Sequence, residues 1–337
     1  MRLATYNVEW FANLFDEQNR LIVDESWSGR HDVTRREQVE SLGIVFTAMD
    51  ADAVMIIEAP NSGHAQDTVA ALEHFAASFD LRTTRAVMGF ANDTQQEIAL
   101  LYDPGRLSAR HDPQGLLTPS KQGDRVPRFD GTYRIDLDID ATADQVRFSK
   151  PPLELAVTTA SGYALRMIGA HLKSKAPHGA RNRDAVMRLA IANRRKQLAQ
   201  AIWLRERISA NLAEGTPLIV MGDLNDGPGL DEYEHLFGRS SVEIVLGDDL
   251  YDPHARQALQ RLIGAAPTTA RFAQAGQDRF LQVLLDYAMI SPDLMARRPA
   301  WRIWHPFDDV KCWNTPELRD ALLAASDHFP LTLDIEI

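Results

Sequence analysis

A short apolar run ends in polar side chains at residues 217–229, which read PLIVMGDLNDGPG. The run is β-branched and bounded by helix and strand breakers, so it predicts a buried strand. Alternation along a strand places Asp223 and Asn225 on the same side as the chain leaves the sheet. A carboxylate beside an amide suits a site that holds a metal, a water molecule or a phosphate. A strand-capping turn rich in Asp and Asn fits equally well, and these residues alone leave both interpretations open.

Four other polar clusters stand at the ends of apolar runs. They are TYNVEW at 5–10, IIE at 56–58, GAHLKSK at 169–175, and LDY at 285–287 together with SDH at 326–328. The continuous apolar run at 53–57 delivers Glu58, and a Glu in such a place is costly unless it is paired or bound to a metal. The alternative is a Glu58 turned to solvent. The presence of the other clusters favours the interpretation of Glu58 as a metal ligand.

In this order the clusters resemble the endonuclease/exonuclease/phosphatase family, the DNase I-like metal-dependent phosphoesterases. The resemblance runs from Asn7 to His328, and HLKSK and GDLNDGP are most similar to the bacterial nuclease-like branch. It implies an α/β fold of four layers, an α/β/β/α sandwich in which two mainly antiparallel sheets lie face to face with helices outside. Pattern alone reaches only an α/β class with stacked sheets, because strands outnumber helices and most connections are short.

The resemblance also assigns roles to the residues at the strand ends. It makes Glu58 the main ligand of a Mg²⁺ or Mn²⁺ ion, a type of cation that prefers oxygen ligands. Asp327 would complete the metal shell, Glu9 would contact the metal through water, and Asn7 would either orient Asp223 or join the shell and contact the substrate.

The resemblance further implies which residues perform the reaction. Asp223 would hold and polarise the attacking water, or bind a second metal, and Asn225 would donate a hydrogen bond to a phosphate oxygen. Asp286 would orient His328 and raise its pKa, so that the ring donates to the reacting phosphate. His171 would protonate the leaving oxygen or bind phosphate. We expect Asp226, which extends the pattern, to be a turn residue.

Basic residues near these clusters are candidates for substrate binding. Lys150 stands before two prolines, where family members often carry Arg, so its contact would be a point charge and not a bidentate fork. Arg181 and Arg183 open a predicted helix after His171 and are the other two candidates. The wider basic set is interpreted first as ordinary surface charge and second as a wall for a phosphate backbone. It comprises Arg125, Arg128, Arg134, Arg147 and Lys150.

Two branches of the family fit less well. Ala59, Pro60 and Asn61 follow Glu58, which departs from the pattern of abasic-site endonucleases. The signature of inositol phosphatases is replaced by Leu285, Asp286 and Tyr287.

Composition sets the remaining bounds. The 337 residues are 45% hydrophobic and 25% charged, with a net charge of −11, and Cys312 is the single cysteine. These values are ordinary for a globular protein with a large core. We expect a single domain over 1–337 with loop insertions near 11–32, 112–129 and 231–282, a monomer, and no membrane anchor. The lack of a signal sequence predicts a cytoplasmic protein, with a secreted form left open.

Periodicity predicts the helices that support the strands. Thr34 and Glu37 form a capping-box pattern before apolar residues at helical spacing up to Met49. Further helices are predicted over 69–79 and roughly 181–208. Residues 11–32 are expected to form a loop beside the site. We interpret its Trp27 and Arg30 first as solvated loop residues and second as contacts to substrate.

The sequence therefore predicts a metal-dependent phosphoesterase, with phosphodiester hydrolysis on nucleic acid as the first hypothesis. A phosphomonoesterase on a small metabolite, a sphingomyelinase-type lipid phosphodiesterase and a non-catalytic binding module are the alternatives. The retained carboxylate, His and Asn positions argue against the binding module. No amphipathic anchoring stretch supports the lipid enzyme. The acidic balance argues against tight nonspecific DNA binding.

Overall fold

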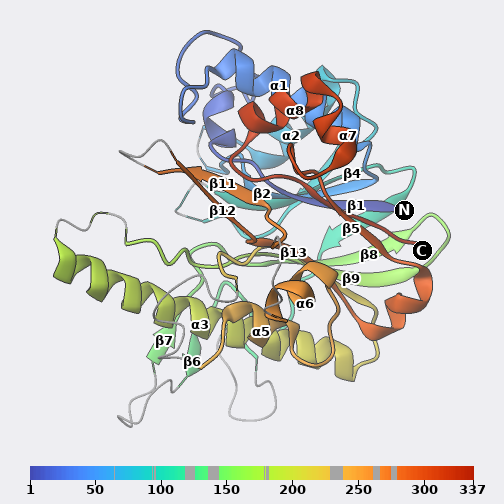
Figure 1. Cartoon of the computed structure of the whole chain (residues 1–337). Coiled ribbons are helices and arrows are strands. Elements are labelled where there is room, and N and C mark those ends of the chain that lie inside the picture. Colours follow the sequence, from blue (N-terminus) through green and yellow to red (C-terminus); the bar gives the residue numbers. More distant parts are fainter. Residues whose placement is uncertain are drawn as a thin grey trace.

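Two β-sheets stack face to face at the centre of the protein (Figure 1). The computed structural model describes residues 1–63, 65–92, 94, 96–117, 126–135, 144–177, 179, 182–227, 238–260, 266–274 and 279–337. The six-stranded sheet runs in the order β14 (Ala300–Ile303), β15 (Leu331–Asp334), β1 (Arg2–Asn7), β2 (Ala53–Ala59), β4 (Glu97–Tyr102), β3 (Arg85–Met88). The five-stranded sheet runs β13 (Asp286–Ile290), β10 (Leu218–Asp223), β9 (Ala164–His171), β8 (Leu153–Thr159), β5 (Leu107–His111).

Each large sheet contains one parallel pair among antiparallel ones. β1 pairs in parallel with β2, and β9 pairs in parallel with β10. Parallel strands end at the same edge of a sheet, so Asn7 lies beside Ile57, and Asp223 lies beside His171. Asp223 is also the register partner of Asp286 on the antiparallel strand β13. The sheet topology thus brings distant polar clusters to one edge.

Apolar residues fill the space between the sheets. Leu3, Met55 and Leu100 of one sheet pack in one buried cluster with Leu155 and Met221 of the other. The sheets approach closely at Gly169, where an added Cβ would lie 2.4 Å from the Met55 Sδ. Glycine at this position therefore lets the two layers meet.

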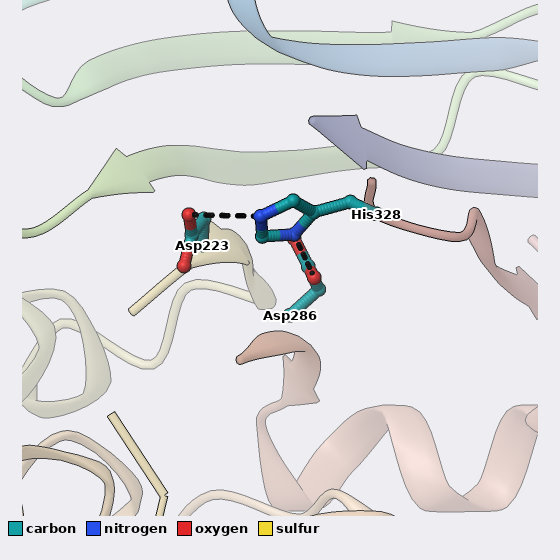
Figure 2. Close-up of side chains that lie close together, drawn as sticks. All are labelled: Asp223, Asp286 and His328. Atoms are coloured by element: carbon teal, nitrogen blue, oxygen red, sulfur yellow. Dashed lines mark hydrogen bonds and ion pairs between the residues drawn. The ribbon is translucent and has the colours of Figure 1, made fainter. Parts of the chain in front are cut away.

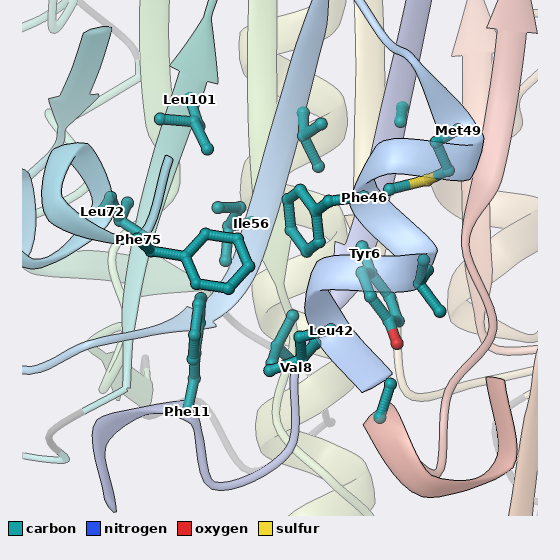
Figure 3. Close-up of a cluster of buried hydrophobic side chains, with 14 of the residues drawn as sticks. Tyr6, Val8, Phe11, Leu42, Phe46, Met49, Ile56, Leu72, Phe75 and Leu101 are labelled. Atoms are coloured by element: carbon teal, nitrogen blue, oxygen red, sulfur yellow. The ribbon is translucent and has the colours of Figure 1, made fainter. Parts of the chain in front are cut away.

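Helices cover both outer faces. The six-stranded sheet packs against α1 (Arg35–Met49), α2 (Thr68–Ser78) and α8 (Pro316–Ala325), and the five-stranded sheet packs against α3 (Arg183–Ala213), α5 (Ser241–Leu246) and α6 (Pro253–Leu259). Figure 3 shows Phe46 and Phe75, from α1 and α2, packed with Tyr6 and Ile56 of the sheet. The predicted four-layer sandwich is confirmed.

Several predicted boundaries need adjustment. The capping box of Thr34 and Glu37 opens α1 as predicted, but α3 continues to Ala213, beyond the predicted end. The predicted insertion at 231–282 carries α5, α6 and the hairpin of β11 (Ala270–Ala273) and β12 (Phe280–Val283). In the predicted loop at 112–129, Phe129 is fully buried against Trp203.

The remaining elements are short. They are η1 (Phe11–Leu14), the pair β6 (Tyr133–Ile135) and β7 (Asp144–Val146), η2 (Pro292–Arg297), and α7 (Val310–Trp313). Among the residues described, no helix combines the length and the apolar character needed to cross a bilayer.

Candidate active site

His328 and Asp286 form a buried pair at the edge where the strands end. His328 Nδ1 lies 2.7 Å from Asp286 Oδ2, and His328 Nε2 lies 3.9 Å from Asp223 Oδ2 (Figure 2). All three side chains are nearly inaccessible to solvent. Burial alone would lower the pKa of His328, but the charges of Asp286, Asp223 and Asp327 outweigh it and raise the pKa well above its ordinary value. The ring is therefore held as a cation, with Nε2–H directed toward Asp223.

Asp223 is held by three hydrogen bonds. Asn7 Nδ2 donates to Asp223 Oδ2 at 3.0 Å, Asn225 Nδ2 donates to the same oxygen at 3.2 Å, and the Asn225 backbone N–H donates to Oδ1 at 2.7 Å. Asn225 takes a left-handed conformation with φ 50°, which Asn tolerates better than most residues. Burial raises the pKa of Asp223 to about 7. This carboxyl is therefore oriented and poised to exchange a proton near neutral pH.

Glu58 approaches the site through a distortion of β2. Its φ is 61°, and the pairing of β2 with β4 shifts register between Ile57 and Ala59. Left-handed backbone is unfavourable for Glu, and a bulge of this kind re-aims a side chain at the rim of a sheet. Gln96 Nε2 donates to Glu58 Oε2 at 2.7 Å, and burial raises the pKa of Glu58.

Lys150 and His171 lie on the Glu58 side of the site. Lys150 Nζ is 3.2 Å from the ring nitrogens of His171 and 3.9 Å from Glu58 Oε1. His171 Nε2 is 3.6 Å from Asp223 Oδ2. Burial, followed by the charge of Lys150, lowers the pKa of His171 well below its ordinary value. His171 is therefore neutral, and Lys150 is the cation on this side.

Glu9 and Asp327 form an acidic corner with Glu58. Burial, followed by the charge of Asp327, raises the pKa of Glu9 to about 7, and burial also raises the pKa of Asp327. Ser326 joins this corner to β1, because its hydroxyl donates to the Asn7 carbonyl at 2.7 Å.

The residues of the edge are suited to a hard divalent cation. Asn7 Oδ1 and Asp286 Oδ1 are buried without a hydrogen-bond partner among the described residues. One polar atom from each of Asp223, Asp286 and His328 lies within 4.8 Å of the others, but a protonated His328 has no lone pair for a metal, so the two carboxylates are the ligand atoms of this group. Oxygen donors dominate on both sides of the site, which fits Mg²⁺ or Mn²⁺. Glu58, Asp327, Asn7 and Glu9 remain the proposed ligands, with Asp223 as a second possibility.

Comparison with known proteins identifies the family. A sequence model of the Endonuclease/Exonuclease/phosphatase family matches residues 4–328. The chain belongs to this family. Its members are metal-dependent phosphoester hydrolases, so this protein is placed in that broad class.

Solved structures agree with the family at the level of the fold. A crystal structure of TDP2 from C. elegans superposes with a TM-score of 0.50 at 12% identity, covering 100% of this chain and 75% of that one. A mannosyl-6-phosphatase from Bacteroides thetaiotaomicron superposes with a TM-score of 0.49 at 12% identity, covering 100% of both chains. No curated protein sequence gives a significant match.

Most residues that the family resemblance selected meet at this edge, but Arg183 does not. Arg183 lies exposed in the first turn of α3, and Arg181 falls outside the described residues. Arg128 pairs with Asp130 at 2.6 Å, and Arg147 Nε donates to Thr132 Oγ1 at 2.8 Å. Within the described chain, Lys150 is the member of the basic set that reaches the site.

Two expectations of the sequence were wrong. Asp226 is not a simple turn residue, because it is buried and accepts from Lys175 Nζ at 2.6 Å and from Arg194 Nη1 at 2.8 Å. Arg30 is not solvated, because it is buried and its Nη1 lies 2.6 Å from Glu9 Oε2. Gln96, the partner of Glu58, was missed altogether. No local pattern marks these residues, since their partners lie far along the chain.

Replacing the buried Asp223 carboxyl with an amide should stabilise the metal-free protein at alkaline pH. Because the pKa of Asp223 is raised in the folded state, the folded protein binds its proton more tightly, and stability falls as pH rises from about 4 through about 7. We expect Asp223→Asn in EDTA to raise Tm at pH 8 but not at pH 4, by roughly 1–2 °C per kcal/mol gained for a chain of this length. Thermal unfolding at the two pH values measures this. An equal shift in Tm at pH 4 and pH 8 would mean that the charge of the buried carboxylate does not destabilise the folded protein.

Proposed function

We propose that this protein is a divalent metal-dependent phosphodiesterase that hydrolyses nucleic acid. The observation that carries the proposal is the cationic His328, held by Asp286 at 2.7 Å with its second nitrogen facing Asp223 across 3.9 Å. A fixed cation opposite a carboxyl that exchanges protons near neutral pH is the arrangement needed to bind an anionic ester and activate a water molecule.

Each side chain has a distinct part in this proposal. A bound divalent ion would neutralise charge on the phosphate oxygens. Asp223 orients the attacking water and accepts its proton at Oδ1 or Oδ2, while Asn7 and Asn225 fix the carboxyl plane. His328 Nε2–H donates to the phosphate, and Asp286 keeps Nδ1 protonated.

The leaving oxygen requires a proton donor of its own. His171 is neutral and donates at most through one ring N–H, whereas Lys150 carries a charge 3.2 Å from that ring. We therefore assign stabilisation of the leaving group to Lys150 and His171 together. The family resemblance gave His171 two alternative roles, to protonate the leaving oxygen or to bind phosphate, and we add Lys150 to the first of them.

Exposed rings near the site support nucleic acid as the substrate. Phe280 on β12, Phe307, and Trp313 at the end of α7 expose 49%, 38% and 50% of their surface. The Arg271 guanidinium lies 3.4 Å from the centre of the Phe280 ring, and the Arg271 backbone N–H donates to the Asp327 carbonyl. Rings and guanidinium groups near a phosphate site are typical of surfaces that stack nucleobases.

The substrate class can be tested by salt dependence. We expect Mg²⁺- or Mn²⁺-dependent cleavage of single-stranded DNA or RNA. The logarithm of the binding constant should fall linearly with the logarithm of the salt concentration, with a slope of about −0.7 for each phosphate contacted. A phosphomonoesterase should show a much flatter response, because it contacts one phosphate. The measurement is cleavage and binding of a labelled oligonucleotide between low and physiological salt, with mannose 6-phosphate and sphingomyelin in parallel. Rapid phosphate release from the sugar phosphate without nuclease activity would refute the nucleic-acid assignment and leave the metal site standing.

A further inference from the structure

Arg30 places a permanent cation in the acidic corner of the site. Its side chain is only 9% exposed, although it comes from the long segment between β1 and α1. Arg30 Nη1 donates to Glu9 Oε2 at 2.6 Å, and Nη2 donates to the Leu323 carbonyl of α8 at 3.0 Å. The guanidinium is thus fixed between a site carboxylate and a helix of the outer layer.

Glu9 is held on both of its oxygens. Arg30 engages Oε2, and the Trp10 indole N–H donates to Oε1 at 3.0 Å. Trp10 is itself fixed against Gly29, where an added Cβ would lie 2.7 Å from the indole ring. In this arrangement each Glu9 oxygen already accepts one hydrogen bond, and the charge of the carboxylate is partly neutralised by Arg30.

The charges of the acidic corner favour one divalent ion over two. Glu9, Glu58 and Asp327 repel one another, and this repulsion adds to burial in raising the pKa of Glu9. Arg30 opposes it and lowers the pKa of both Glu9 and Asp327 relative to burial alone. Three carboxylates, the Arg30 guanidinium and the Lys150 ammonium group, 3.9 Å from Glu58, carry a formal charge of minus one, which a single Mg²⁺ or Mn²⁺ already exceeds. A second divalent ion would bring two more positive charges close to a buried guanidinium, which Coulomb repulsion opposes.

We propose that the Arg30 guanidinium takes the place that a second divalent cation occupies in two-metal sites, so that this protein binds one metal ion per active site. The inference rests on the proposed metal-dependent function. Two-metal phosphoesterases hold ions about 3.5–4 Å apart between shared carboxylates. Here Glu9 is the carboxylate that could be shared, and Arg30 already neutralises it.

Metal stoichiometry tests the proposal directly. In calorimetric titration of the metal-free protein with Mn²⁺, the wild type should bind one ion. Arg30→Met should bind two, because Glu9 and Asp327 then lack their cation. The double variant Arg30→Met, Glu9→Gln should return to one, because it also removes the freed carboxylate. Electron paramagnetic resonance should show coupling between two Mn²⁺ ions in Arg30→Met alone.

Controls separate the role of the charge from a general loss of structure. Arg302 is another partly buried arginine, paired with Asp309 at 2.7 and 2.8 Å away from the acidic corner, and Arg302→Met should keep the wild-type stoichiometry. If Arg30→Met loses the wild-type circular dichroism spectrum, Arg30→Gln takes its place, since an amide can still donate to the Leu323 carbonyl. Two ions in the wild type, or one ion in the folded Arg30 variant, would overturn the inference while leaving the proposed function intact. A wild type that binds no Mn²⁺ would overturn both.

Discussion

His328→Ala should lower kcat/KM for phosphodiester hydrolysis by about 10²–10⁴-fold, the range for loss of a positioned acid–base group. The variant removes the cation that faces Asp223 and the phosphate, and it leaves the buried Asp286 without its partner at 2.7 Å. Initial rates on bis(p-nitrophenyl) phosphate with saturating Mn²⁺ measure the loss. His254→Ala is a matched control. His254 lies on α6, where its Nδ1 is 3.9 Å from the carboxylate of Asp252, the N-cap of the helix, and it forms no hydrogen bond or ion pair with the described residues of the proposed site. Its removal should leave the rate unchanged.

The same pair gives a sharper test through a double-mutant cycle. If Asp286 acts only by holding and charging His328, Asp286→Asn should cost little in a protein that already carries His328→Ala. The pH profile separates the roles further, since Asp286→Asn alone should lower the pKa of His328 and weaken activity on the alkaline side. Losses that multiply in the double variant would show that Asp286 has a separate role, such as binding metal through its unpartnered Oδ1.

Glu58→Gln should weaken metal binding at least about tenfold and reduce activity accordingly at low metal concentration. The change keeps the shape of the side chain but removes the charge that is proposed to bind the ion. Titration of Mn²⁺ into EDTA-treated protein measures affinity, and activity against Mn²⁺ concentration measures its consequence. Glu97→Gln serves as the control, because Glu97 is a buried acid on the neighbouring strand β4, bound to Asn92 and outside the proposed metal shell. Full wild-type activity in excess chelator would contradict the proposed metal dependence.

The sequence predicted the residues that local chemistry marks. Asp223, Glu58 and His171 each end an apolar strand, and period-two alternation with nearby breakers makes such positions recognisable without a structure. The pairing of Asp286 with His328 came from resemblance to the family, because 42 residues separate them and no spacing rule joins them. The four-layer order came from the same resemblance.

The sequence did not predict contacts that depend on long-range packing. Arg30 looked like a loop residue because its neighbours are polar, yet α8 supplies a carbonyl acceptor 293 residues away. Asp226 looked like a turn because Gly227 follows it, and its partner Arg194 on α3 becomes visible only once the helix is docked. The left-handed backbone of Glu58 arises from a bulge in pairing with β4, which a single strand cannot reveal.

The pairing of β15 with β1 has a consequence for the order in which the protein is made. Thr5 of β1 is the register partner of Leu331, so β1 waits for residues more than 300 positions later before both of its edges are paired. Contacts of such long sequence separation form late and slow folding. His328 lies just before β15, so the cation of the dyad arrives with this pairing. A chain still emerging from the ribosome, surrounded by RNA, is therefore expected to lack the complete reactive group until its sheet closes.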